Sequence, residues 1–286
     1  MIKYLLILLQ FVVINSLSSQ LDVTTSFEWH HDTLNGEYFG KTSMHIPVKF
    51  SGDTSTYYFQ FDTGANKSYV YTGGEKDSTL FSTIAKEGDI ESNIGRLNLI
   101  KRNTSQAYRK NGKKYIGTIG SDFLRDKIVV IDFVKDSISF VTDYDSSKYS
   151  LAPLSLRSGR PVLEIKSQGE KFYFLFDTGS SLFELWTTKK NWRKWSEKEG
   201  EVKDYPIRSW GKINTAYRKE LSEKVFLTLC PHLRIGSVWY NSNRKFARLF
   251  REIGVSGIIG NKPFLNNVIV MDIKNKRMGV KKCADQ

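Results

Sequence analysis

The sequence is poor in residues that define several specialised classes of protein. Of its 286 residues, two are cysteine, six are proline and four are histidine. No low-complexity stretch occurs, so the composition is that of an ordinary globular protein. His30 and His31 are adjacent, but no cysteine or acidic cluster completes a metal site around them. We therefore expect no metal and no other cofactor.

Acidic residues are also scarce relative to basic ones. Asp and Glu number 30 against 43 Lys and Arg, which gives a formal net charge of +13. Such a charge favours anionic partners, here an anionic envelope or membrane surface, although a basic surface that serves only solubility explains it equally well. Basic residues alternate with tryptophan over 188–198, but a surface helix explains that segment better than nucleic-acid binding. We expect no nucleic-acid partner.

Long apolar runs are confined to the N-terminus. Lys3 precedes an apolar run over 4–14, and small residues follow at 16–19, which is typical of a secretory signal peptide over 1–19. The run is too short to span a bilayer comfortably. We expect a secreted, periplasmic or otherwise extracytoplasmic protein, with a retained N-terminal anchor as the alternative.

One tripeptide, Asp-Thr-Gly, occurs twice, within 61–65 and within 176–180. Each copy follows an aromatic and aliphatic run that reads as the second strand of a hairpin. The similarity continues downstream, where Gly120 and Gly260 each end an Ile-Gly element and precede a Val- and Ile-rich strand. The chain is therefore one unit written twice, and two carboxylates on matching turns suit acid–base chemistry.

These repeats resemble the halves of aspartic proteases of the pepsin and retropepsin kind. The resemblance covers nearly everything after residue 40, and the short halves are more similar to fused retropepsin subunits than to pepsin lobes. It implies an all-β, bilobal fold with two lobes related by a pseudo-twofold axis and few short helices. We expect the lobes to comprise 20–148 and 149–286.

The resemblance also assigns roles to the residues of the two turns. It implies that Asp62 and Asp177 share one proton and activate a water molecule, with Asp177 the more readily ionised because a hydroxyl can reach it. The supporting residues would tighten the turns, link the lobes through the threonines, and hydrogen-bond a carboxylate: Thr63, Gly64, Ala65, Thr178, Gly179 and Ser180.

The function implied is an exported aspartic endopeptidase that acts on a polypeptide substrate as a monomer. The alternative is a non-catalytic peptide-binding or inhibitor-like protein on the same two-lobed scaffold. A flap should cover the cleft from within 71–116, with 87–89 or 93–95 as its tip, although neither matches a specific flap motif. Activity is expected at mildly acidic to neutral pH.

Smaller features complete the expectations. Cys230 and Cys283 are an even pair in an exported chain, which suggests a disulfide, with two unpaired buried thiols as the alternative. Helices are expected over 188–198, where Trp192 and Trp195 lie one turn apart, and over 243–253. The segment 21–38 would add an edge strand beneath the lobes.

Overall fold

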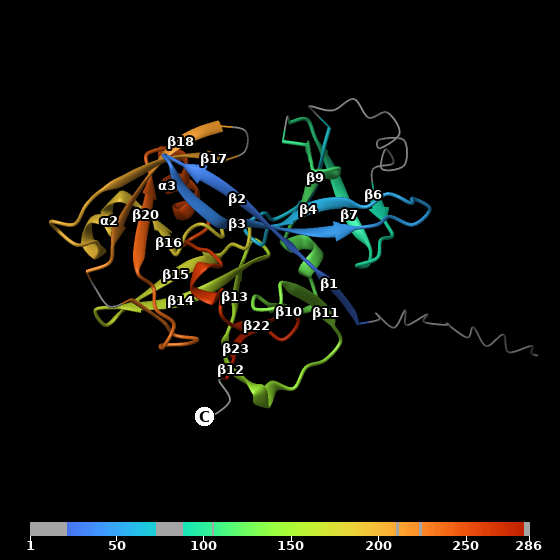
Figure 1. Cartoon of the computed structure of the whole chain (residues 1–286). Coiled ribbons are helices and arrows are strands. Elements are labelled where there is room, and N and C mark those ends of the chain that lie inside the picture. The colour runs from blue at the N-terminus through green and yellow to red at the C-terminus, as the bar shows by residue number, and fades with distance from the viewer. Residues whose placement is uncertain (1–21, 73–87, 105, 210–211, 223–224, 283–286) are drawn as a thin grey trace, which may run out of the picture.

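The computed structural model describes residues 22–72, 88–104, 106–209, 212–222 and 225–282 (Figure 1). The expected signal peptide, 1–19, and Cys283 lie outside the described residues, and both predictions that rest on them stay predictions. In the described part of the chain the strands form three sheets.

The first sheet is built from the first half of the chain. Its strands are β2 Glu28–Leu34, β3 Glu37–Val48, β4 Tyr57–Phe61, β5 Ser68–Tyr71, β6 Gly88–Ile90, β7 Leu97–Arg102, β8 Tyr108–Lys110 and β9 Lys113–Ile119. They run in the order β2-β3-β4-β9-β5-β7-β6, and β8 pairs with β9. In β4 the side chains alternate between fully and partly buried, as a strand with one face on the core requires.

The second sheet is built from the second half. Its strands are β13 Ser155–Arg157, β14 Arg160–Ser167, β15 Glu170–Phe176, β16 Leu185–Thr187, β17 Lys203–Ser209, β18 Lys212–Glu220, β19 Val225–Leu227, β20 Ser237–Asn241 and β21 Gly257–Ile259. They run in the order β13-β14-β15-β21-β16-β20-β18-β17, and β19 pairs with β14.

The two sheets repeat one pattern around their Asp-Thr-Gly turns. The strand before the turn pairs in parallel with the strand that ends in the Ile-Gly element, β4 with β9 and β15 with β21. The strand after the turn pairs antiparallel with that same strand, β5 with β9 and β16 with β21. The internal repeat of the sequence is therefore a repeat of structure.

A third sheet is shared by both halves. Its strands are β1 Val23–Ser26, β10 Ile128–Asp132, β11 Ser137–Val141, β12 Tyr149–Pro153, β22 Val268–Asp272 and β23 Arg277–Lys281. They run in the order β1-β11-β10-β22-β23-β12, beneath the other two sheets (Figure 1). β1 pairs with β11 at one edge, so the prediction that 21–38 supplies an edge strand here is confirmed.

The pairing of β10 with β22 relates the halves by symmetry. Ile128 faces Asp272 and Asp132 faces Val268, so Val130 lies opposite Val270, its own counterpart in the repeat. An antiparallel pair with that register has a local twofold axis between its central residues. The pseudo-twofold axis of the molecule therefore passes between Val130 and Val270.

Helices are few and short. The α-helices of the described residues are α2 Lys189–Trp195 and α3 Arg244–Glu252, and the 3₁₀ turns are η1 Ser121–Leu124, η2 Ser146–Lys148 and η3 Lys262–Phe264. Both α-helices fall where sequence predicts them, and each has a polar cap, Thr188 and Asn243, that accepts a backbone N–H. None of the helices described here is long and apolar enough to cross a membrane.

The main hydrophobic core joins the three sheets. It contains buried side chains from the first sheet, the shared sheet and the second sheet, such as Phe59, Phe140 and Phe174. A smaller cluster around Trp186 and Trp239 lies in the second half. The structure thus has the all-β, bilobal, pepsin-like fold predicted from the sequence. The expected lobe limits stay predictions; the polar segment 143–148 connects β11 with β12 and contains η2.

Candidate active site

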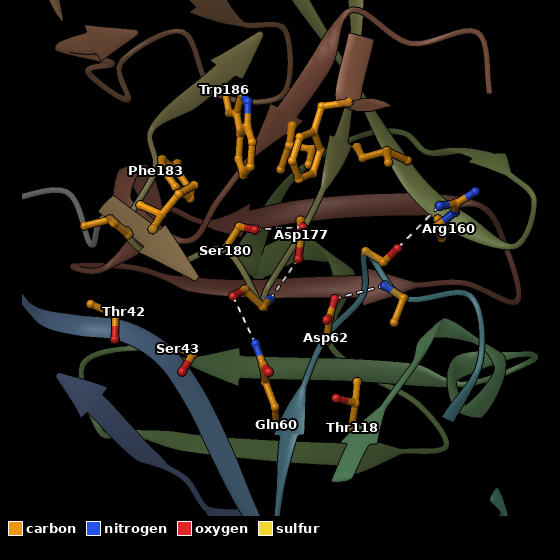
Figure 2. Close-up of a pocket in the computed structure, with 18 of the residues that line it drawn as sticks. Thr42, Ser43, Gln60, Asp62, Thr118, Arg160, Asp177, Ser180, Phe183 and Trp186 are labelled. Carbon is orange, nitrogen blue, oxygen red and sulfur yellow. Dashed lines mark hydrogen bonds between the residues drawn. The ribbon is translucent and has the colours of Figure 1, made fainter. Parts of the chain in front are cut away.

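Each predicted aspartate stands at the end of a strand in the middle of its sheet. Asp62 directly follows β4 and its backbone N–H donates to the carbonyl of Ile119 at 2.9 Å. Asp177 directly follows β15 and donates in the same way to Ile259 at 2.9 Å. Both carboxyl groups line one pocket between the halves (Figure 2).

Reciprocal threonine hydrogen bonds join the two turns. The Thr63 hydroxyl donates to the carbonyl of Phe176 at 2.6 Å and accepts the N–H of Thr178 at 3.1 Å. The Thr178 hydroxyl donates to Phe61 at 2.7 Å and accepts the N–H of Thr63 at 3.0 Å. Both threonines are buried, so four buried polar groups find their partners only across the interface of the halves.

The glycines of the turns allow the aspartates to approach. A Cβ on Gly64 would lie 2.5 Å from the carboxyl carbon of Asp177, and one on Gly179 would lie 2.6 Å from that of Asp62. Both distances are far below contact distance, so neither position has room for a side chain. Each glycine therefore makes room for the carboxyl group of the opposite half.

The carboxyl groups receive different hydrogen bonds. Asp62 accepts the N–H of Ala65 at 2.9 Å. Asp177 accepts the N–H of Gly179 at 2.9 Å and also the hydroxyl of Ser180 at 2.8 Å (Figure 2). Because alanine has no hydroxyl, the first half cannot repeat the serine contact. The backbone of the two turns is therefore symmetric, but a negative charge is better stabilised on Asp177 than on Asp62.

The two aspartates differ accordingly in acidity. Burial, the negative charge of Asp177 and a hydrogen bond with that carboxyl raise the pKa of Asp62 well above its ordinary value. Burial also raises the pKa of Asp177, but hydrogen bonds from Ser180, Asp62, Gly179 and Gly64 oppose the shift. Asp62 therefore holds a proton more tightly than Asp177, and Asp177 is the more readily ionised of the two.

The Ile-Gly elements pack directly behind the turns. A Cβ on Gly120 would lie 2.4 Å from the carbonyl oxygen of Lys67, and one on Gly260 would lie 2.0 Å from that of Ser180. Behind the second turn the buried Asn261 side chain donates to the carbonyl of Thr178 at 3.0 Å. The glycines at these positions are required by close approach of the backbone.

The pocket in front of the aspartates has a volume of about 310 Å³ and two unlike sides. Polar groups of the first half, among them Gln60, Tyr71 and Thr118, line one side. The Gln60 amide donates to the carbonyl of Gly179 at 3.1 Å. Apolar side chains of the second half line the other side: Leu175, Leu182, Phe183, Trp186, Ile207, Phe246, Leu249 and Ile258. The cavity can therefore accept a large apolar side chain beside the carboxyl pair.

The β2–β3 hairpin crosses from the first half to the second (Figure 1). The amide of Asn35 at its tip donates to the carbonyl of Asp204 at 2.7 Å, and Glu37 accepts the hydroxyl of Tyr205 at 2.6 Å. Farther along, Thr42 and Ser43 line the pocket (Figure 2). The hairpin therefore bridges the halves and bounds the site.

The proposed flap tip at 93–95 is wrong. These residues form the turn between β6 and β7, Ile94 is buried in the core, and Asn93 accepts the N–H of Lys49 at 2.8 Å. The other suggested tip includes Glu87, outside the described residues. From the connection after β7, Gln106 reaches the pocket.

Several pocket residues carry little signal in the sequence. Gln60 could have been found, because it interrupts an aromatic strand two positions before Asp62. Tyr71 and Arg160 line the pocket with no such pattern around them.

Of the expected cysteine pair, Cys230 is half-buried and Cys283 lies outside the described residues. Among described residues no group of three or more His, Cys, Asp or Glu side chains is arranged to hold a metal ion.

Comparisons with known proteins add little to this geometry. No protein-family model matches the sequence, and no curated protein matches it. Among solved structures the chain is similar to basic 7S globulin from soybean, with a TM-score of 0.47 and 10% sequence identity over 91% of this chain and 94% of that chain.

Proposed function

We propose that the protein is an exported aspartic endopeptidase. The observation that carries the proposal is the pair of turns that brings Asp62 and Asp177 together in one pocket, where the pKa of Asp62 is raised well above its ordinary value and hydrogen bonds oppose the rise in the pKa of Asp177. Unequal hydrogen bonding gives the two carboxyl groups complementary protonation states, which general acid–base catalysis requires.

The reaction uses the two aspartates in turn. Asp177, as the carboxylate, takes a proton from a water molecule as the oxygen attacks the peptide carbonyl. Asp62, as the acid, donates its proton to the carbonyl oxygen, and a tetrahedral diol forms without a covalent bond to the enzyme. When that intermediate collapses, Asp177 donates the proton that it took from water to the leaving nitrogen and the C–N bond breaks. Asp62 takes a proton from a hydroxyl of the diol, so the pair returns to its starting state with one proton.

The surroundings of the pair fit a polypeptide substrate. The apolar wall around Phe183 and Trp186 suits a large apolar side chain next to the scissile bond. The Thr63 and Thr178 bonds fix both turns before substrate arrives, so little reorganisation is left for the transition state. Export rests on the N-terminal segment 1–19 and is proposed from sequence alone.

The decisive experiment is cleavage of denatured casein by the mature chain between pH 3 and 8. The variants are Asp62→Asn and Asp177→Asn, which keep the shape of each side chain but remove its acid–base chemistry. Asp143→Asn, at an exposed position, is the matched control. A parallel series contains pepstatin, an inhibitor of aspartic proteases.

We expect wild type and the control to cleave, and both dyad variants to be inactive. Equal cleavage by wild type and dyad variants would reject the proposal, because the activity would then have another source. Absence of cleavage together with tight peptide binding would favour the peptide-binding alternative, for which the bridging β2–β3 hairpin beside the pocket would be the structural reason.

A further inference from the structure

Arg160 brings an unpaired cation to the edge of the candidate site. It is the first residue of β14, after a turn at Ser158 and Gly159 whose φ angles are 51° and 80°. The side chain lines the pocket, on the other side of the aspartates from Thr42 and Ser43 (Figure 2). Only 8% of the residue is exposed.

The protein gives this guanidinium almost nothing to bind. One nitrogen donates to the carbonyl of Gly64 at a long 3.5 Å, and the buried Nε has no hydrogen-bond partner. No carboxylate among the described residues lies within ion-pair distance of it. A buried charge without a partner is costly, and arginine presents five donors in a planar fork. Most of that donor capacity is free for a ligand.

Arg160 keeps its charge in the pocket. Burial lowers its pKa, while the negative charge of the Asp177–Asp62 pair acts in the opposite direction, and a guanidinium stays protonated throughout the working pH range of proteins. The carboxyl pair cannot serve as its partner during hydrolysis, because its single negative charge is needed to take the proton from water. The Arg160 guanidinium therefore needs a different anionic partner, which the substrate can supply.

We propose that Arg160 binds a carboxylate of the substrate residue that lies on the Gly64 side of the scissile bond. The carboxylate is either an Asp or Glu side chain or the C-terminal carboxylate of the peptide, since both present the same two oxygens to the fork. The inference rests on the proposed peptidase function and names its substrate class: acidic peptides with a large apolar residue on the other side of the bond. A side-chain carboxylate fits the proposed endopeptidase, whereas binding of the C-terminal carboxylate would make the enzyme a carboxypeptidase.

The charge of the whole molecule acts in the same direction. A formal net charge of +13 attracts acidic polypeptides and raises the rate at which they meet the pocket. The long-range field draws acidic chains of any sequence, whereas Arg160 selects the position of one carboxylate. The two effects are separable, because salt screens the first far more than the second.

The test begins with a denatured proteome digested by the wild-type protein, with cleavage sites read by mass spectrometry. We expect Asp or Glu, or a free C-terminus, to be enriched at one fixed position next to the cleaved bond. Matched peptides are then made from one good site. One pair has Glu or Gln at that position within a longer chain, and the other pair ends there in a carboxylate or an amide.

We expect kcat/KM for the carboxylate peptide to exceed that for its neutral partner by about 10-fold or more in one of the two pairs. Whichever pair shows the preference identifies the source of the carboxylate. In Arg160→Met the ratio should fall to about 1, and in Arg160→Lys it should fall part of the way. Arg157→Met is the control: Arg157 is an exposed residue that faces Arg160 across the β13–β14 pair, and its ratio should stay high.

Two failures are distinguishable. If wild type cleaves peptides with no carboxylate preference, or if Arg160→Met lowers kcat/KM equally for both members of a pair, Arg160 only supports the Gly64 turn and the inference is wrong. If wild type cleaves nothing, the peptidase proposal fails. Calorimetry with non-cleavable hydroxyethylene peptides bearing Glu or Gln then still decides whether Arg160 selects a carboxylate.

Discussion

Gly64 lies so close to Asp177 that a Cβ atom on Gly64 would sit 2.5 Å from the carboxyl carbon of Asp177. The same relationship joins Gly179 to Asp62 at 2.6 Å. The carboxyl group of each half therefore lies against the glycine backbone of the other half. The spacing of the two carboxyl groups depends on the absence of a side chain at both glycines.

Replacing Gly64 by alanine should push the two carboxyl groups apart. We expect kcat/KM on casein-derived peptides to fall by about 100-fold or more, because displacements of about 1 Å have such effects in active sites, and stability to fall by about 1–3 kcal/mol from overpacking. Gly40→Ala is the control, since the atoms nearest to a Cβ there belong to the Tyr38 side chain and lie at 3.4 Å or farther. A fully active Gly64→Ala protein would contradict the geometry.

Thr63→Val should destabilise the joined halves. The substitution keeps the shape of the side chain but removes a hydroxyl that donates to Phe176 and accepts from Thr178. Both groups are left buried without a partner, and each such loss costs about 1–3 kcal/mol. Thermal unfolding measures the loss. Thr63→Ser keeps the hydroxyl and should lose much less; similar losses for Val and Ser would mean that packing of the methyl group matters and the hydrogen bonds do not.

The pH dependence of kcat/KM should be bell-shaped, with limbs set by the carboxyl pair as a unit. Activity rises as Asp177 ionises and falls as Asp62 loses its proton. Because burial raises the pKa of both, both limbs should lie above the ordinary range of aspartate. A rate maximum below about pH 3 would contradict the raised pKa values, since an ordinary aspartate has a pKa near 3.9.

Ser180→Ala should move the acid limb of that profile. The serine hydroxyl holds the pKa of Asp177 down, so its removal raises that pKa and shifts the acid limb to higher pH. The alkaline limb, which reports Asp62, should move less, and the bell should narrow. Ser180→Thr keeps a hydroxyl and serves as the comparison. An unchanged acid limb in Ser180→Ala would show that the hydroxyl does not stabilise the carboxylate.

Asp62→Asn should stabilise the fold at neutral pH. The pKa of Asp62 is raised in the folded state, so the folded protein holds this proton more tightly than the unfolded chain. That contribution is complete below about pH 4, the unfolded range for aspartate, and is lost as pH rises through the folded pKa. Asparagine never ionises. The Tm difference between Asp62→Asn and wild type should therefore be more positive at pH 8 than at about pH 3.5, and Asp143→Asn should show no such change.

Particular residues explain how much of this structure the sequence predicts. The two Asp-Thr-Gly turns, the Ile-Gly elements and both α-helices are encoded locally, by a tripeptide, a glycine spacing and apolar residues about one helical turn apart. Each of these sequence patterns lies within a short segment. The turns and the Ile-Gly elements occur twice, and the helices show helical spacing of their apolar residues. The resemblance that they carry implies the bilobal fold, the joined threonines and the more acidic Asp177.

The remaining features depend on contacts between distant segments. The Asn35 side chain donates to the carbonyl of Asp204, and Arg160 donates to the carbonyl of Gly64. No local sequence pattern around these residues predicts either hydrogen bond. At 93–95 the sequence instead suggested a feature, a flap tip, that the structure does not have. A glycine with a φ of 109° at Gly95 is compatible with many tight turns, and only the burial of Ile94 decides that this one belongs to the core.

The register in which Val130 faces Val270 has an evolutionary consequence. Each half contributes strands to the shared sheet, and its innermost strand, β10 or β22, pairs with the equivalent strand of the other half. A single-length ancestor could therefore have assembled as a homodimer through that edge. Tandem duplication and fusion would then have turned an intermolecular contact into a covalently tethered one. Once fused, the two copies were free to diverge, and the serine present beside only one aspartate is the kind of difference that a true homodimer could never encode.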